Sequence, residues 1–144
     1  HTNDAASSVM RLVDMGVEPF MVASSVVGII AQRLVRKVCP ACSEWEPMTP
    51  EEEDIIGRPL MRVKHAHGCN LCNNSGYKGR ISLHEVLPMD KTLRQMITSG
   101  ASVDEMKTYA VNNLGMDTLK ESATQLVEQG ITTVDELLKV AYYE

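Results

Sequence analysis

Apolar and polar residues follow a helical period near both ends of the chain and a strand-like period on either side of its middle. Residues 3–16 and 18–28 predict two helices, because their apolar side chains recur every three or four positions. Residues 29–38 are rich in β-branched side chains and residues 80–87 alternate between apolar and polar, so both are predicted strands. After Pro88 the pattern is helical throughout, and further helices are predicted over residues 90–100, 102–115, 116–130 and 132–144.

The segment between the two predicted strands, residues 39–79, has a different character. It holds all four cysteines, four of the six prolines and most of the polar turn residues. One short helix is predicted inside it, with Thr49 as N-cap, Pro50 in the first helical position and Glu52 completing a capping box. The pattern therefore predicts two helices, a strand, a cysteine-rich insert, a second strand and four helices, which is an α-rich α/β fold.

Composition narrows the class of protein. The chain has 144 residues, of which 44% are hydrophobic and 23% charged, so it can bury a core of its own. Its formal net charge of −5 disfavours a nucleic-acid binder, which usually carries a basic face. The longest apolar stretch, residues 20–31, is too short to cross a bilayer as a helix. We expect a cytoplasmic protein with reduced thiols, and a fragment of a longer chain, because the sequence opens on HTNDAA.

The four cysteines form two pairs of equal spacing, CPAC at residues 39–42 and CNLC at residues 69–72. A two-residue spacing lets both sulfurs of a pair face one point, and two such pairs complete a tetrahedral shell of thiolates. Zinc suits this ligand set and can hold together a loop that has little core of its own. The predicted ligands of a structural Zn²⁺ are Cys39, Cys42, Cys69 and Cys72.

Other interpretations of these cysteines remain open. CPAC alone is similar to the redox motif of thioredoxin-like proteins, in which the first thiol lies at the start of a helix. Two disulfides would require an extracellular chain, which nothing in the sequence suggests. His65, His67 and His84 lie near the cysteines in sequence and offer imidazole ligands in place of a thiolate.

Several motifs together carry a resemblance to a known family. They are HTNDA, RLVDMGVEPF, AQRLVR, CPAC, GCNLC followed by GYKGR, the dipeptide HE toward the end of the second strand, and GITTVDELLKV near the end. In this combination the sequence resembles the C-terminal part of the ATPases of type II secretion and type IV pilus assembly, the GspE/PilB family. The resemblance covers nearly the whole chain.

The resemblance implies a fold and a division into parts. The family fold is a RecA-like P-loop ATPase domain that assembles into a hexamer. Residues 1–38 would be the C-terminal end of that core, residues 39–79 an inserted tetracysteine zinc module, and residues 80–144 the last core strand followed by a helical C-terminal subdomain.

The resemblance also implies a function. The parent protein would couple ATP hydrolysis, with Mg²⁺, to pseudopilin or pilin assembly at the inner membrane. Its partners would be neighbouring ATPase subunits and inner-membrane platform proteins, with no nucleic acid, and it would lie at the cytoplasmic face through these partners. His1 matches the family's histidine box and is a candidate catalytic residue, while Gln32 and Arg33 are candidates for nucleotide binding.

The sequence itself limits what this chain does alone. It contains no G-x4-G-K-[ST] phosphate-binding loop, so we expect no ATP hydrolysis by the chain in isolation. Arg36 and Lys37 are expected to belong to a solvated basic face, and Lys78 and Arg80 to contact solvent or an acidic neighbour. Two other functions stay open: a stand-alone zinc module that binds protein, or less readily nucleic acid, and a thiol–disulfide oxidoreductase using CPAC.

Overall fold

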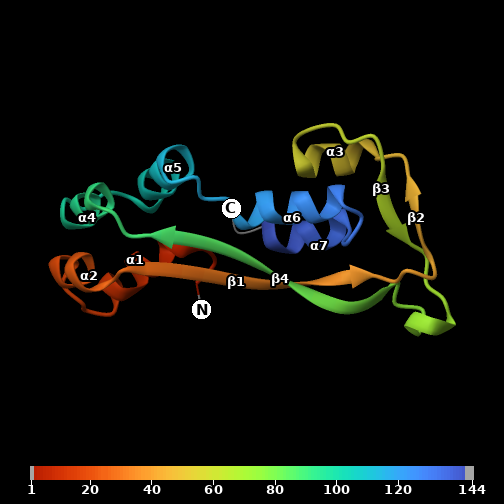
Figure 1. Cartoon of the computed structure of the whole chain (residues 1–144), viewed down its shortest axis with the longest axis horizontal. Helices are drawn as coiled ribbons and strands as arrows, with labels where there is room; N and C mark the ends of the chain where they lie inside the picture. The colour runs from red at the N-terminus through yellow and green to blue at the C-terminus, as the bar shows by residue number, and fades with distance from the viewer. Residues whose placement is uncertain (1, 142–144) are drawn as a thin grey trace. The chain divides into compact units, whose positions relative to one another are not determined.

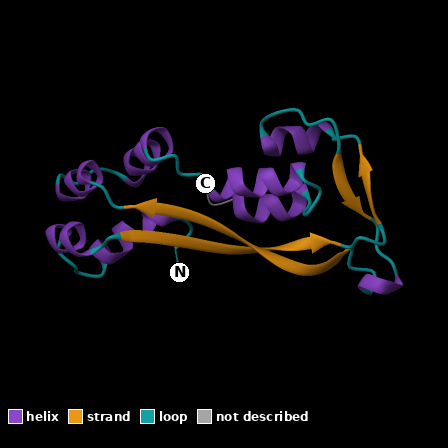
Figure 2. Cartoon of the chain, viewed as in Figure 1, coloured by secondary structure: helices purple, strands orange, loops and turns teal. Residues whose placement is uncertain are grey.

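The structure is a computed structural model that describes residues 2–141. Within these residues the chain forms seven α-helices, one short 3-10 helix and four β-strands, as Figures 1 and 2 show. In chain order the elements are α1 (Ala5–Asp14), α2 (Pro19–Ser25), β1 (Gly28–Val38), β2 (Ser43–Glu46), α3 (Pro50–Ile56), β3 (Val63–Ala66), η1 (Asn70–Cys72), β4 (Tyr77–Pro88), α4 (Lys91–Thr98), α5 (Val103–Asn113), α6 (Leu119–Glu128) and α7 (Val134–Ala141). The α/β class expected from the sequence is confirmed.

The strands form two separate two-stranded sheets. The long strands β1 and β4 pair with one another and run in opposite directions in Figure 2. Strands β2 and β3 form an antiparallel hairpin inside the cysteine-rich segment, in which Ser43 pairs with Ala66 and Glu46 with Val63. The sequence analysis did not predict this hairpin, because four residues per strand are too few for a clear alternation of polar and apolar positions.

All seven predicted helices are present, with shorter ends within the described residues. The capping box at the start of α3 is confirmed, since the Glu52 amide donates to Thr49 Oγ1 at 3.2 Å and the Thr49 amide to Glu52 Oε1 at 3.0 Å. The predicted helix 116–130 begins only at Leu119, because the Met116 amide donates to the Ala110 carbonyl and closes the end of α5 instead. Helix α2 ends at Ser25, and Gly28 already belongs to β1.

The chain divides into two units, each built from two separate stretches of sequence. The first unit comprises the residues up to 32 and residues 84–118, and the second comprises residues 33–83 and the residues from 119 onward. Each unit has its own core. The buried apolar residues of the first are Ala5, Ala6, Val9, Val22, Ala23, Ala31, Leu87, Leu93, Ile97, Met106, Ala110 and Met116. Those of the second are Val35, Ile56, Val63, Leu83, Leu119, Ala123, Val127, Val134, Leu137 and Val140.

A buried carboxylate supports the start of α1 in the first unit. The Glu85 side chain is fully buried, and its Oε1 accepts a hydrogen bond from the Ala5 amide at 3.0 Å. Asp4 caps the same helix by accepting from the Ser7 amide at 2.7 Å, and Lys107 lies 3.6 Å from the Asp4 carboxylate. Residues that are 80 positions apart in sequence therefore fix the beginning of this helix.

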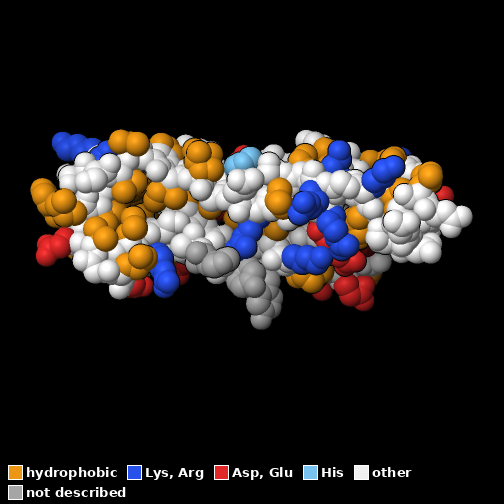
Figure 3. Space-filling model, turned by 90° about the horizontal axis from the view of Figure 1, so that it is seen from below, with side chains coloured by type: hydrophobic (Ala, Val, Ile, Leu, Met, Phe, Trp, Pro, Cys, Tyr) orange, Lys and Arg blue, Asp and Glu red, His pale blue; other side chains and the backbone are white. Residues whose placement is uncertain are grey.

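The surface has both apolar and basic regions. In the first unit Phe20 is 68% exposed and Val27 is 83% exposed. On the face drawn in Figure 3, hydrophobic side chains gather in one region and Lys and Arg side chains in another. Among residues 2–141, no helix is both long enough and apolar enough to cross a membrane.

Candidate metal centre

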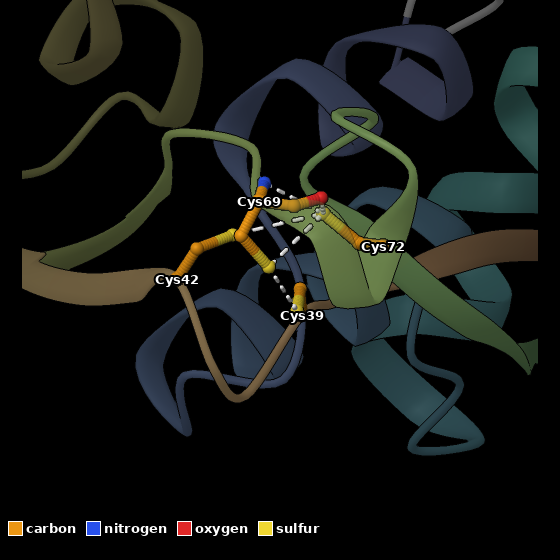
Figure 4. Close-up of side chains that lie close together, drawn as sticks. All are labelled: Cys39, Cys42, Cys69 and Cys72. Atoms are coloured by element: carbon orange, nitrogen blue, oxygen red, sulfur yellow. Dashed lines mark hydrogen bonds between the residues drawn. The ribbon is translucent and has the colours of Figure 1, made fainter.

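The four cysteines come from two turns that the fold brings face to face, as Figure 4 shows. Cys39 directly follows β1 and Cys42 directly precedes β2, while Cys69 caps η1 and Cys72 ends it. Cys39 and Cys72 are buried, and the other two are half-buried. Both pairs belong to the second unit.

The sulfur positions fit a tetrahedral metal ion. The Sγ–Sγ distances are 3.8 Å for Cys39–Cys69, 3.8 Å for Cys42–Cys72 and 3.7 Å for Cys69–Cys72. Four ligands about 2.3 Å from a central zinc, at tetrahedral angles, are separated by about 3.8 Å. All four sulfurs lie within 4.8 Å of one another, so a single ion can be placed among them.

Backbone amides surround the sulfur of Cys72. The amides of Cys69 and Gly76 both donate to Cys72 Sγ at 3.2 Å. Burial raises the pKa of the Cys72 thiol, but these two amides favour the thiolate and bring its pKa down to about 6. Burial raises the pKa of Cys42 to about 11, so a metal ion would have to displace a proton from that thiol.

The second turn owes its shape to residues in the left-handed region. Asn73 and Asn74 have φ of 55° and 60°, which asparagine tolerates better than most residues. Gly76 has φ of 82°, and its carbonyl accepts from the Cys39 amide at 2.9 Å. This hydrogen bond joins the two cysteine turns directly, so the backbone holds the ligand geometry together with the ion.

The nearby histidines have other partners. His65 Nδ1 lies 2.6 Å from Glu46 Oε2 and its Nε2 lies 3.0 Å from Glu52, while His67 Nε2 lies 2.6 Å from Glu46 Oε1. Burial lowers the pKa of His65, but hydrogen bonds to these two carboxylates raise it overall. His84 lies on β4 in the first unit. The structure therefore groups the four thiols with one another and leaves the histidines outside that group.

The geometry does not favour the alternative interpretations of the cysteines. CPAC is followed by strand β2, so the helix that a thioredoxin-like thiol needs at its site is not there. The described cysteines are free, and sulfurs 3.7–3.8 Å apart are far beyond the roughly 2.05 Å of a disulfide.

The candidate nucleotide residues are not part of this cluster. Gln32 is exposed and Arg33 is half-buried, and both lie on β1. His1 lies outside the described residues. Their predicted roles therefore remain predictions.

Sequence analysis missed an ion pair that joins β1 to α7. Arg36 was expected on a solvated basic face, but its Nε and Nη2 donate to Glu136 Oε1 at 3.0 and 2.9 Å, and its amide donates to Glu136 Oε2 at 2.9 Å. The guanidinium also stacks on Tyr77, 3.9 Å from the ring centroid, and the Tyr77 hydroxyl lies 2.8 Å from Thr133 Oγ1. Thr133 caps α7 by accepting from the Glu136 amide at 3.3 Å, but the Glu136 carboxylate binds Arg36 and does not complete a capping box.

Comparison with known proteins gives a consistent set of similarities. The sequence profile of the family described as "Type II/IV secretion system protein" matches residues 1–139. The "Type IV pilus assembly ATPase PilB" of Thermus thermophilus is 41% identical over 143 residues, which are 96% of this chain and 16% of that protein. The "Type II secretion system ATPase E" of Vibrio cholerae is 38% identical over 144 residues, which are 97% of this chain and 28% of that protein.

The fold is similar to that of a solved motor protein. The crystal structure of the pilus retraction motor PilT with bound ADP matches with a TM-score of 0.57 over 97% of this chain and 30% of that chain, at 18% identity. At this identity the match supports the fold alone. The chain spans 16 to 28% of the length of the two curated relatives named above.

Proposed function

The chain belongs to the family of type II/IV secretion system proteins, and from this premise we propose that it is the zinc-containing C-terminal part of a secretion or pilus assembly ATPase. The observation that carries the zinc assignment is the cluster of four sulfurs, three of whose separations equal the edge length of a zinc–thiolate tetrahedron. Full coverage by thiolates leaves no open ligand position, so the ion would be structural and would not activate water.

The proposed parent is a RecA-like P-loop ATPase that works as a hexamer. Residues 1–38 would end its core, residues 39–79 would be the zinc insert and residues 80–144 the last core strand with the helical subdomain. Its partners would be the neighbouring subunits and inner-membrane platform proteins, which would hold it at the cytoplasmic face of the membrane. The names of the curated relatives support this proposal but do not distinguish secretion from pilus assembly.

In the parent, ATP and Mg²⁺ would bind at motifs that this sequence lacks. His1 would lie near the γ-phosphate, and Gln32 and Arg33 would face the nucleotide or a neighbouring subunit. The chain alone would therefore bind zinc and not hydrolyse ATP.

Elemental analysis of protein purified without chelators tests the zinc assignment. We expect about one zinc per chain, and we expect Cys72→Ser to lose most of it, because three thiolates hold the ion more weakly than four. His67→Ala is the matched control, since its ring binds Glu46, and should keep one zinc. Metal-free wild-type protein, or loss of zinc in the histidine variant, would contradict the proposal.

The role of the zinc module is tested in the full-length parent. Replacing Cys69 and Cys72 by serine should abolish secretion or pilus assembly in cells, while ATP hydrolysis by assembled hexamers falls much less. A saturated zinc site can present a surface but contributes no catalytic group. Equal loss of both activities, with the hexamer intact, would place the module at the nucleotide site instead.

A further inference from the structure

The second unit contains a pocket that none of the proposed roles uses. Its volume is about 510 Å³, within the range of about 300–1,000 Å³ that is usual for small-molecule sites. Strand β1, the first cysteine turn, β2, β3, β4 and the turn between α6 and α7 all contribute to it. The lining residues are Lys37, Val38, Pro40, Ser43, Lys64, Lys78, Gly130 and Ile131.

The charged residues of the pocket are all lysines. Lys37, Lys64 and Lys78 line it and no acidic residue does. Within residues 2–141, none of these three ammonium groups has a carboxylate within 4.0 Å. Lys37 and Lys78 lie on the paired strands β1 and β4, where like charges repel. Lys37 and Lys78 are exposed and Lys64 is half-buried, so solvent screens their mutual repulsion, but together they give the hollow a positive potential.

A buried hydroxyl in the pocket wall lacks a partner. Ser43 is 9% exposed, and its Oγ is the one fully buried side-chain oxygen or nitrogen within residues 2–141 that makes no hydrogen bond. An unsatisfied buried polar group destabilises the folded state, so native proteins seldom retain one without a use. The same burial closes the Oγ off from the pocket in this structure, so the hydroxyl would donate to an oxyanion there only after a rotation about χ1.

Lys64 is held in place for such a contact. Its ammonium lies 5.3 Å from the centroid of the Trp45 ring, and its alkyl chain passes close to Gly130. A side chain at Gly130 would collide with the Trp45 ring, because a Cβ there would lie 2.5 Å from its nearest atom. The stacked arrangement limits the motion of Lys64, so little rotamer entropy is lost when it binds an anion.

We propose that this pocket binds a soluble phosphate-bearing ligand, held by Lys37, Lys64 and Lys78 and by a hydrogen bond from Ser43. A phosphate group carries up to two negative charges and accepts from several directions, which suits three separate ammonium groups. A carboxylate carries one charge and is matched best by the planar fork of arginine, and no arginine lines the pocket. The pocket is larger than a single phosphate needs, so the ligand is a diphosphate or a phosphate ester.

The chain's single tryptophan provides the assay. Zinc-loaded protein is titrated with inorganic pyrophosphate while Trp45 emission is recorded, since an anion bound to Lys64 changes the charge over the ring. We expect a saturable change that weakens as ionic strength rises. Lys64→Gln should lower the affinity about tenfold, the usual size for a charged hydrogen bond in a recessed site.

Ser43→Ala separates binding from folding. Because Ser43 Oγ has no protein partner, its removal should leave the melting temperature unchanged or slightly raised, while pyrophosphate affinity falls about fivefold. Lys91→Gln, which removes an exposed lysine of the first unit, is the control and should bind as wild type does. Zinc content is measured in every variant, so that failure of the metal site is not confused with failure of this one.

The possible results are unambiguous. No saturable binding by the zinc-loaded wild type, or equal weakening by Lys91→Gln, overturns the proposal and leaves only general attraction between charges. Tighter binding of a glutamate-rich peptide than of pyrophosphate, lost in the Lys64 and Ser43 variants, would also overturn it and identify an acidic protein segment as the occupant.

Discussion

At the scale of single residues, Glu136 is a buried carboxylate of the second unit that is held by several hydrogen bonds. It is 3% exposed, and it accepts three hydrogen bonds from Arg36 and one from Lys139. Glu136→Gln keeps the shape but removes the charge, and Arg36 can regain water because its side chain is 44% exposed. We therefore expect a loss of about 2 kcal/mol in the free energy of unfolding at neutral pH, measured by urea denaturation.

A surface glutamate is the control for that measurement. Glu128 pairs with Arg58, but its side chain is 39% exposed, so Glu128→Gln should cost at most about 1 kcal/mol. Equal losses in the free energy of unfolding for the two substitutions would mean that burial of the Glu136 ion pair does not increase its contribution to stability.

The same carboxylate predicts a pH dependence. Burial raises the pKa of Glu136, but the hydrogen bonds from Lys139 and Arg36 lower it by more. Its pKa in the folded protein is therefore below the ordinary 4.5. A group with a depressed folded pKa contributes stability above its unfolded pKa and loses it as the pH falls through the folded value. The stability difference between wild type and Glu136→Gln should therefore shrink below about pH 4.5. A difference that stays constant down to pH 2 would contradict the ionic contribution.

At the scale of elements, the second cysteine turn depends on one glycine. A Cβ at Gly76 would lie 2.9 Å from the Ala66 Cβ, and the left-handed φ adds strain. Gly76→Ala should therefore shift the amide that donates to Cys72 Sγ and weaken zinc binding at least tenfold, by chelator competition. Gly57→Ala has a similar φ of 86° with open space around it, so it should strain α3 and leave zinc affinity unchanged. Loss of zinc in both variants would show that general destabilisation is the cause.

The elements also show how far a sequence determines this structure. The α3 capping box was predictable because it depends on residues three positions apart. The clustering of the four cysteines was predictable although the two pairs lie 30 positions apart, because the repeated C-x2-C spacing marks both pairs as parts of one ligand set. The β2–β3 hairpin and the partner of Arg36 were not, because they depend on contacts with residues about 20 and 100 positions away. Short-range motifs can therefore be predicted from one sequence. Strand pairing and ion pairs between distant residues depend on which side chains the fold buries together, and the sequence alone does not give this.

At the scale of the whole molecule, the separate cores predict a local response to metal removal. The four cysteines and helices α6 and α7 belong to the second unit, where Val63 and Ile56 share a core with both helices. Chelation should therefore increase amide hydrogen exchange in residues 33–83 and from 119 onward. Residues 84–118 should keep their protection, since their core contains none of the ligands. A uniform increase along the chain would mean that the two units unfold together.

The division into units has a consequence for the order in which the chain can fold during synthesis. The first unit cannot close its core until Met116 has been made, and the second must wait for Val140, although its cysteines are complete at residue 72. A ribosome that adds about 5–20 residues per second would complete the four thiols several seconds before the last residues of their unit's core. During that interval the domain is incomplete, and its four thiols can react with zinc but also with oxidants. Early capture of the ion would protect them and would fix the two turns before the C-terminal helices complete the core of the same unit.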